Sequence, residues 1–332
     1  GITMDSLSRD PSSLIRLSLR LSRSPNLSLH LTNAKTNFRL LSVVCSAKNN
    51  TYKADLKVRF FVWRGDNMEI SINLAEKVAS AVRSCKPLMM QKFSVSEKGS
   101  ASNLVTTADT AVQERLRALL GKILPQAGFL GEESPEYTQG ELYWVVDPID
   151  GTTNFVRGMR LSVISVALVN NNEEVLGVVY HPYSEELFSA VKGQGAFLNG
   201  KRIRVSERDF SHSLFFTAFS VYKKQYARQC MEVMQKVYSE CDDFRRLGTA
   251  ALELCYLAAG RGELYFELRL FPWDWAAAAV VLREAGGVVG TVAKERLRHD
   301  SPVILLAANS EMNFTKLQEI VSSNVPQRPY TE

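Results

Sequence analysis

Apolar residues recur every three or four positions in several stretches of the chain, which is the spacing of one face of an α-helix. The first such stretch predicts a helix over residues 67–90, with Pro87 in its last turn. A second predicted helix has Asp109 at or just inside its start. Later helices are predicted over residues 222–238, through Leu254 and Leu257 to Gly260, over residues 275–285, and after Ser310.

Short apolar runs rich in β-branched residues predict strands between these helices. The predicted strands cover residues 128–134, with two acids at the end, and then 143–146, 163–169, 175–180, 187–191, 214–219, 265–267 and 304–308. Asn199-Gly200 adds a strong hairpin signal. Strands mixed with helices, with hairpins between them, indicate a layered α/β fold with a mixed sheet.

One of these strands runs directly into a motif with two carboxylates. Pro148 and Gly151 predict that the strand breaks into a turn, and Asp147 and Asp150 flank the break. Gly151-Thr-Thr-Asn154 has the small and capping residues that open a helix. Acids at a strand end, followed by a helix N-terminus, offer oxygen ligands for a hard cation beside amides for an anion. This suits a metal-bound phosphate, although a polar turn with a capping Asp explains the same residues taken alone.

Other acids stand at the ends of predicted elements. Asp109 lies at a helix start, Glu132 and Glu133 follow a short strand, and Asp274 precedes an alanine-rich helix. Taken singly, each has a structural explanation: a helix cap for the two aspartates and an exposed acidic turn for the glutamates. Their occurrence together with the central motif makes the structural explanation insufficient.

The first fifty of the 332 residues differ in composition from the rest. They contain ten Ser, ten Leu and seven Lys or Arg, against two Asp or Glu. Such N-termini are typical of organelle transit peptides, and residues 43–47 resemble a plastid processing site. We therefore predict that residues 1–50 are a disordered transit peptide for the chloroplast. The alternatives are the mitochondrion as destination, and a disordered tail with no address.

Without this segment the charge of the chain is balanced. The net charge of +5 arises entirely within residues 1–50, so it gives no argument for nucleic-acid binding. No apolar run of about 18 residues indicates a membrane span. The 45% apolar fraction is ordinary for a globular protein. Five scattered cysteines without a CxxC pair fit neither a disulfide framework nor a zinc site, and Cys85 and Cys255 are expected to be buried thiols.

Three motifs together resemble the inositol monophosphatase family, which consists of metal-dependent, lithium-sensitive phosphatases. The motifs are Gly131-Glu-Glu-Ser134, Asp147-Pro-Ile-Asp-Gly-Thr-Thr-Asn-Phe155, and Trp273-Asp274 closing on Glu284-Ala-Gly-Gly287. Three motifs in the right order are far more specific than any one of them. The resemblance implies a phosphatase domain over residues 66–325, folded as the layered α-β-α-β-α sandwich of inositol monophosphatase and fructose-1,6-bisphosphatase. It also implies a homodimer.

The resemblance further implies a site for two or three Mg²⁺ ions. Glu132, Asp147 and the backbone carbonyl of Ile149 would hold the first ion, and Asp147, Asp150 and Asp274 the second. Glu132 would also help to hold a third ion through water. Carboxylate and carbonyl oxygens, with positions left for water and phosphate, are what Mg²⁺ prefers.

Catalytic roles follow from the same resemblance. The Thr152 hydroxyl and Asp109 would orient and deprotonate the attacking water, and the amides of Gly151 and Thr152 would receive phosphate oxygens. Lys98 matches a family lysine near the ions, and Glu133 would lie just outside the metal ligands.

Substrate choice depends on a second set of positions. Thr153 stands where nucleotide-type relatives commonly have lysine, which favours the inositol branch. Asp150, the turn Gly248-Thr249-Ala250 and Glu267 match positions that contact ring hydroxyls in that branch, although Gly248 and Thr249 could simply cap the next helix. Two departures oppose this: Arg157 is typical of nucleotide-type members, and the bulky Trp275 could repack the wall beneath Asp274.

The sequence thus predicts a Mg²⁺-dependent phosphomonoesterase that hydrolyses inositol monophosphate, or a related small polyol or sugar phosphate, by direct attack of water. A 3′(2′),5′-bisphosphate nucleotidase is the nearest alternative enzyme. A plastid scaffold that retains the fold without turnover is an alternative of another class. The expected partner is a small phosphorylated substrate, with neither nucleic acid nor membrane.

Overall fold

The computed structural model divides the chain into two compact units, residues 1–69 and 70–332. The residues that it describes are 2–3, 18–19, 27–31, 41–47, 50–54, 70–97, 104–133, 140–219 and 224–326. Lys98 and much of the predicted transit peptide therefore lie outside the described residues. Among the described helices, none is long and apolar enough to cross a membrane.

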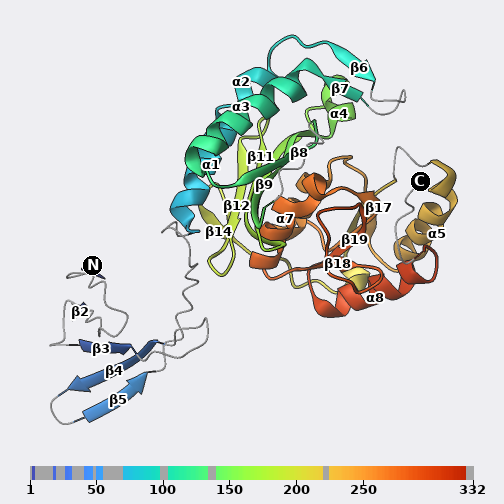
Figure 1. Cartoon of the computed structure of the whole chain (residues 1–332). Coiled ribbons are helices and arrows are strands. Elements are labelled where there is room, and N and C mark those ends of the chain that lie inside the picture. Colours follow the sequence, from blue (N-terminus) through green and yellow to red (C-terminus); the bar gives the residue numbers. More distant parts are fainter. Residues whose placement is uncertain are drawn as a thin grey trace. The chain divides into compact units, whose positions relative to one another are not determined.

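The described part of the first unit is an antiparallel sheet with the strand order β1-β2-β3-β4-β5 (Figure 1). The strands are β1 (Ile2–Thr3), β2 (Ser18–Leu19), β3 (Leu27–Leu31), β4 (Leu41–Ala47) and β5 (Asn50–Ala54). Whether residues 1–50 act as a removable address stays a prediction, which N-terminal sequencing of the mature protein would test.

The second unit contains helices and strands in mixed order. Its helices are α1 (Ile72–Arg83), α2 (Lys86–Met89), α3 (Thr107–Ile123), α4 (Thr152–Val156), α5 (Ala227–Tyr238), α6 (Ala250–Ala258), α7 (Pro272–Glu284) and α8 (Glu311–Ser322). Its strands are β6 (Val95–Glu97), β7 (Leu104–Thr106), β8 (Gly128–Gly131), β9 (Leu142–Asp150), β10 (Val163–Asn170), β11 (Glu173–His181), β12 (Glu186–Val191), β13 (Gly195–Leu198), β14 (Lys201–Ile203), β15 (Leu214–Ala218), β16 (Asp243–Arg245), β17 (Leu264–Leu270), β18 (Val288–Thr291) and β19 (Val303–Ala308).

Two large sheets organise this unit. One has the order β14-β13-β12-β11-β10-β9-β8 and is antiparallel except between β8 and β9. The other, with the order β16-β15-β17-β19-β18, mixes parallel and antiparallel pairs. β10 is buried along its whole length, because helices cover both faces of its sheet.

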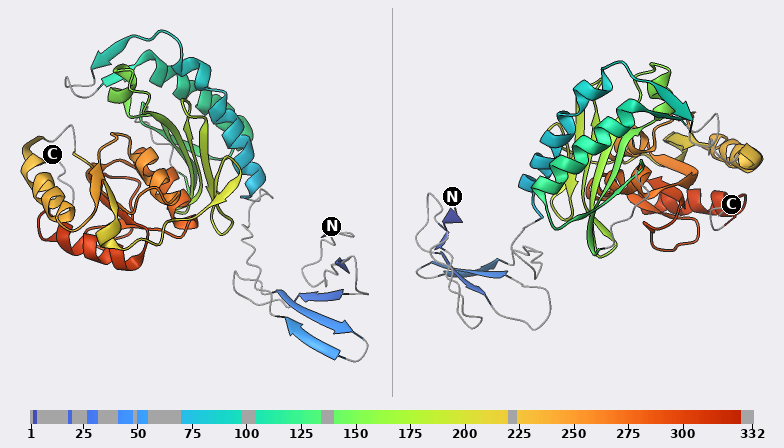
Figure 2. Two further views of the ribbon diagram at one scale, coloured as in Figure 1. Left: turned by 180° about the vertical axis from the view of Figure 1, so that it is seen from behind. Right: turned by 45° about the horizontal axis from the view of Figure 1, so that its top comes forward.

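The helices complete five layers (Figures 1 and 2). Helices α1 and α3 cover the outer face of the first sheet, α6 and α7 lie between the two sheets, and α5 and α8 cover the outer face of the second. Three buried clusters of apolar side chains join these layers. The predicted α-β-α-β-α sandwich is confirmed.

Several element boundaries differ from the prediction, and two of these differences have a clear physical reason. The helix expected over residues 67–90 is two helices, because α1 ends at Arg83 and Pro87 lies in the first turn of α2, where its missing N–H is not needed. The strand expected to end at Val146 runs through Pro148 to Asp150. A bulge makes this possible: Asp147 pairs with Ser165 but Asp150 pairs with Val163, so β9 has one residue more than its partner. The short strands β16 and β18 were not predicted.

Candidate active site

Acids from four elements converge where β9 ends. They come from the end of β8, the bulged end of β9, and the first turns of α3 and α7. Burial and the charges of Glu132, Asp150, Asp274 and Asp109 all raise the pKa of Asp147 well above its usual range. Carboxylates that are far apart in sequence are therefore close enough in the fold for their charges to act on Asp147.

The bulge of β9 orients the first carboxylate. Asp147 Oδ1 accepts a hydrogen bond of 2.9 Å from the Ile149 amide, and Asp147 is fully buried. The Thr152 hydroxyl donates to the Ile149 carbonyl oxygen at 3.1 Å. The carbonyl expected to bind metal and the hydroxyl expected to orient water are thus in contact with each other.

Asp150 is held by the segment that begins α6. Its Oδ2 accepts hydrogen bonds from the Thr249 hydroxyl at 2.5 Å and from the Ala251 amide at 2.8 Å. Burial raises the pKa of Asp150 to about 6, although these hydrogen bonds oppose the shift. Thr249 does occupy the N-cap position of α6, but its side chain makes no capping hydrogen bond there. The capping role considered for this hydroxyl is therefore wrong.

Asp109 belongs to a capping box at the start of α3. Its Oδ2 accepts from the Thr106 amide at 2.7 Å and from the Thr106 hydroxyl at 2.5 Å. Its Oδ1 is buried and has no hydrogen-bond partner among the described residues. Burial raises the pKa of Asp109 to about 6, and the charges of Glu133 and Glu132 act in the same direction. Asp109 is both a helix cap and an acceptor with one oxygen to spare.

Asp274 lies in the first turn of α7 and is half-buried. Its Oδ2 accepts from the Phe271 amide at 2.7 Å. Burial, followed by the charges of Asp150 and Glu132, raises its pKa well above the usual range. Asp274 therefore combines the capping role with a place in the acid cluster, by which we mean Asp109, Glu132, Asp147, Asp150 and Asp274.

Sequence reasoning missed the residue that joins the two turns of the site. The side-chain amide of Asn154 in α4 donates through Nδ2 to the carbonyl oxygens of Leu161, at 2.9 Å, and Leu247, at 2.7 Å. Gly151 has a φ of 86°, and a Cβ there would lie 2.9 Å from the Leu161 oxygen and 3.2 Å from the Gly248 oxygen. Only glycine fits this left-handed, crowded position. Asn154 was predicted merely to help open a helix, and local sequence carries no sign of such distant partners.

The residues expected to select the substrate lie in different surroundings. Glu267 in β17 is half-buried, and the Tyr265 hydroxyl donates to its Oε2 at 2.7 Å. Thr153 and Arg157 are exposed. Trp275 is fully buried and stacks on the His299 ring, with 5.2 Å between centroids. Trp275 therefore packs in the core between the sheets and does not line the site.

The donor set fits a hard cation. The largest influences on the pKa of Asp147 are burial and four other carboxylates, so a positive ion would relieve strong repulsion. Asp147 and Asp274 each have one oxygen without a hydrogen bond to any described residue. Within that part of the chain, however, no three His, Cys, Asp or Glu side chains already form a metal-ligand cluster.

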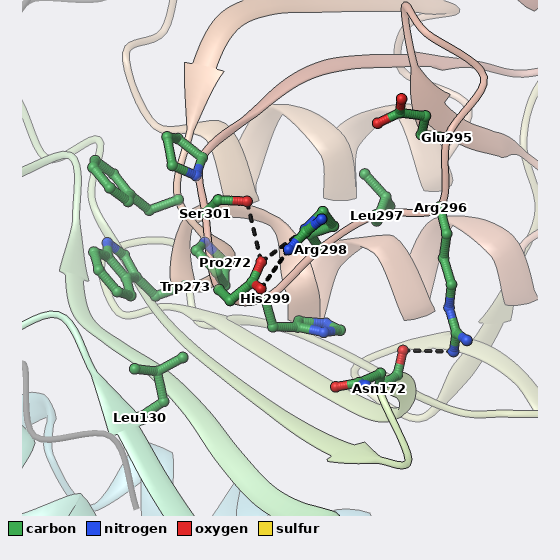
Figure 3. A pocket seen from close by; sticks show the side chains of 13 residues that line it. Leu130, Asn172, Pro272, Trp273, Glu295, Arg296, Leu297, Arg298, His299 and Ser301 are labelled. Carbon is green, nitrogen blue, oxygen red and sulfur yellow. Dashed lines mark hydrogen bonds and ion pairs between the residues drawn. The ribbon is translucent and has the colours of Figure 1, made fainter. Parts of the chain in front are cut away.

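A separate pocket of about 940 Å³ lies beside the start of α7 (Figure 3). Leu130, Asn172, Phe271 to Trp273 and residues 295–302 line it, and none of these was predicted to be catalytic. Its two guanidinium groups are already bound to protein acceptors, Arg298 to Asp300 and Arg296 to the Asn172 carbonyl oxygen. With the further acid Glu295, the charges that line the pocket balance, so it has no clear preference for an ionic ligand.

Layered sheets and helices with buried acids at the end of a bulged strand define a class of phosphatases, and comparison with known proteins supports this class. The family model described as the inositol monophosphatase family matches residues 66–325. This chain belongs to that family, which is magnesium-dependent.

Individual relatives agree with this membership. The Nus factor SuhB of Salmonella typhimurium LT2 is 43% identical over 197 residues, which cover 58% of this chain and 73% of the relative. The solved extragenic suppressor protein suhB of Bartonella henselae is 32% identical with a TM-score of 0.70, and the match covers 76% of this chain and 100% of that one. The IMPase of Thermotoga maritima is 30% identical with a TM-score of 0.69, covering 76% and 98%.

Proposed function

We propose that this protein is a Mg²⁺-dependent phosphomonoesterase that hydrolyses inositol monophosphate or a related small polyol phosphate. The observation that carries the proposal is that Glu132, Asp147, Asp150 and Asp274 lie close enough for their negative charges to repel one another in a largely buried place. Such an arrangement is costly for folding unless the charges serve a cation.

These four acids and the Ile149 carbonyl oxygen would hold two or three Mg²⁺ ions. Bound Mg²⁺ would polarise the phosphate oxygens, stabilise the leaving oxygen and make water more acidic. The Gly151 and Thr152 amides would orient the phosphate, because N–H groups at the start of α4 have no hydrogen-bond acceptor within the helix.

Asp109 is suited to receive the proton of the attacking water. Thr106 fixes Oδ2 and leaves Oδ1 to accept it, and a pKa of about 6 suits a base that acts near neutral pH. The water oxygen forms a bond to phosphorus while the ester P–O bond breaks on the opposite side, and the alkoxide leaves with a proton from solvent. Thr152 would orient the same water through its hydroxyl.

A polyol is favoured by the carboxylates beyond the phosphate position. Asp150 and Glu267 can accept hydrogen bonds from neighbouring hydroxyls of a ring. The alternative nucleotidase is favoured by Arg157, which is exposed and forms no ion pair with another described residue. Its guanidinium group could bind a second phosphate as a fork.

The polyol phosphatase and the nucleotidase can be distinguished by assaying purified protein with Mg²⁺ on inositol 1-phosphate, a sugar phosphate and adenosine 3′,5′-bisphosphate. We expect inositol 1-phosphate to have the highest kcat/KM. Glu267→Ala should lower that value about 10- to 100-fold, because one buried hydrogen bond is worth about 1–3 kcal/mol. Arg157→Ala should change it little. Collapse of bisphosphate cleavage in Arg157→Ala, with no effect of Glu267→Ala on inositol 1-phosphate, would establish the nucleotidase instead. A folded protein without turnover on any substrate would favour the scaffold.

A further inference from the structure

We propose that Tyr265 is a positioning residue, which directs Glu267 toward the hydroxyl groups of the substrate and so contributes to selectivity for polyol phosphates. The inference rests on the proposed function, in which Glu267 contacts the leaving group. Tyr265 itself would touch neither substrate nor metal.

The geometry of β17 places the two side chains on one face of the sheet. Residues two apart in a strand point the same way, so the Tyr265 ring and the Glu267 carboxylate are neighbours. Their hydrogen bond joins the phenol oxygen to Glu267 Oε2 at 2.7 Å.

Tyr265 is the fixed member of this pair. It is fully buried in the apolar cluster between the two sheets, whereas Glu267 is half-buried. A ring packed on all sides cannot follow a moving carboxylate. The hydroxyl therefore acts as an anchor at one point, and the carboxylate is the group that is oriented.

The orientation leaves one oxygen for a ligand. Glu267 Oε1 has no hydrogen bond to any residue that the structure describes, since its Oε2 makes the one contact. The charges that act on Glu267 include Asp150 and Arg246. Asp150 is itself fixed by Thr249, and its charge acts on Glu267, so the substrate hydroxyls would lie between the two carboxylates. Two anchored carboxylates would thus present acceptors to adjacent hydroxyls.

Removal of the anchor should weaken binding more than it slows the chemical step. A free carboxylate loses rotamer freedom when substrate binds, and the buried anchor avoids that cost. We expect Tyr265→Phe to raise the KM for inositol 1-phosphate about tenfold with less than about a threefold change in kcat, which corresponds to about 1.4 kcal/mol in binding. The KM for 4-nitrophenyl phosphate, which has no ring hydroxyls, should rise by a clearly smaller factor.

Tyr180→Phe is the matched control. Tyr180 is also a buried tyrosine that donates to a glutamate, Glu185, at 2.9 Å, but this pair is not part of the acid cluster. Tyr180→Phe should leave the KM and kcat for both substrates unchanged. Equal losses on both substrates in Tyr265→Phe, or full additivity with Glu267→Gln in a double-mutant cycle, would show a merely structural role and overturn the proposal.

Failure of the proposed function would look different. A wild-type enzyme that cleaves 4-nitrophenyl phosphate but no polyol phosphate would refute the substrate assignment. A crystal structure of Tyr265→Phe still tests the positioning role, because it needs no turnover. We expect the Glu267 carboxylate to rotate or to occupy two orientations, and an unchanged orientation would contradict the inference.

Discussion

Single residues of the site each serve the fold and the cluster of acids together. Asp109 and Asp274 cap helices with one oxygen and retain another, and Thr249 occupies a cap position while its hydroxyl binds Asp150. For the two aspartates, a capping interpretation and a functional one are therefore not alternatives. Asp147 differs, because its surroundings are chiefly other carboxylates.

Asp147→Asn tests whether this charge serves a cation. The amide is nearly isosteric but removes one negative charge, so we expect phosphatase activity to fall about 10²–10³-fold, the scale of losing one electrostatic contact to the transition state. Without metal, the variant should melt at the same or a higher temperature than wild type, since burial and like charges destabilise the ionised Asp147. Added Mg²⁺ should raise the melting temperature of wild type more than that of the variant.

Asp300→Asn is the control, because Asp300 binds Arg298 at the exposed edge of the separate pocket. It should keep both the activity and the Mg²⁺ effect. Normal turnover in Asp147→Asn, or an equal stabilisation by Mg²⁺, would contradict the metal assignment.

Among the elements, α7 depends most on close approach to a sheet. Its small side chains, Ala276 to Ala279, are all buried. Where α7 crosses β11, a Cβ on Gly177 would lie 2.1 Å from the Ala277 carbonyl oxygen. The backbones of α7 and β11 touch at this crossing. The position of Asp274 at the start of α7 therefore depends on the absence of a side chain at Gly177, which is far away in the sequence.

Gly177→Ala should therefore push α7 away from the first sheet. We expect a loss of about 1–3 kcal/mol in the free energy of unfolding, which is typical of overpacking, together with reduced phosphatase activity. The free energy can be measured by urea unfolding monitored by circular dichroism.

Gly121→Ala, the same chemical change in α3, should alter the free energy of unfolding in the opposite direction. Gly121 lies in α3 with nothing within 4 Å of an added Cβ, so alanine should stabilise the protein by about 0.5–1 kcal/mol. Similar effects of the two substitutions would show that the crossing is not as tight as described.

At the scale of the whole second unit, one buried carboxylate links the layers. Glu174 in β11 accepts from Arg283 of α7 at 2.5 Å and lies 2.7 Å from Nε2 of His299, which precedes β19. Burial opposes ionisation of Glu174. The close contact with His299 and the charge of Arg283 outweigh it, and the pKa lies below the ordinary value.

Glu174→Gln should make stability less dependent on pH. A carboxyl whose pKa is lower in the folded protein stabilises it above the unfolded pKa of about 4.5, and this contribution is lost as pH falls through the folded value. We expect the variant to lose about 1.5–3 kcal/mol at pH 7 and the gap to wild type to close toward pH 3. Urea unfolding at several pH values measures this.

The neighbouring Glu173→Gln is its control. Glu173 pairs with Lys192 at the surface, where ion pairs contribute about 0–1 kcal/mol. A gap for Glu174→Gln that stays constant with pH would show that its ionised form does not join the layers.

Most elements, and the chemistry of the motifs, could be predicted from the amino-acid sequence. Strands β10 to β12 and the hairpin at Asn199-Gly200 follow from local apolar runs and turn residues, and they form as predicted. The acids at the ends of β8, β9 and the start of α7 were recognisable because their spacing belongs to a known family. These features are encoded within short segments, where pattern and propensity act directly.

How those segments meet depends on the packing of the folded chain. β9 passes through Pro148 because β10 accepts a bulge, and β16 and β18 are too short to show a pattern of their own. The bonds of Asn154 to Leu247 and of Thr249 to Asp150 join residues 93 and 99 positions apart. A hydroxyl or amide has many partners within reach of its own helix, and only packing fixes which distant acceptor it meets. The direction of each functional oxygen is therefore a property of the fold.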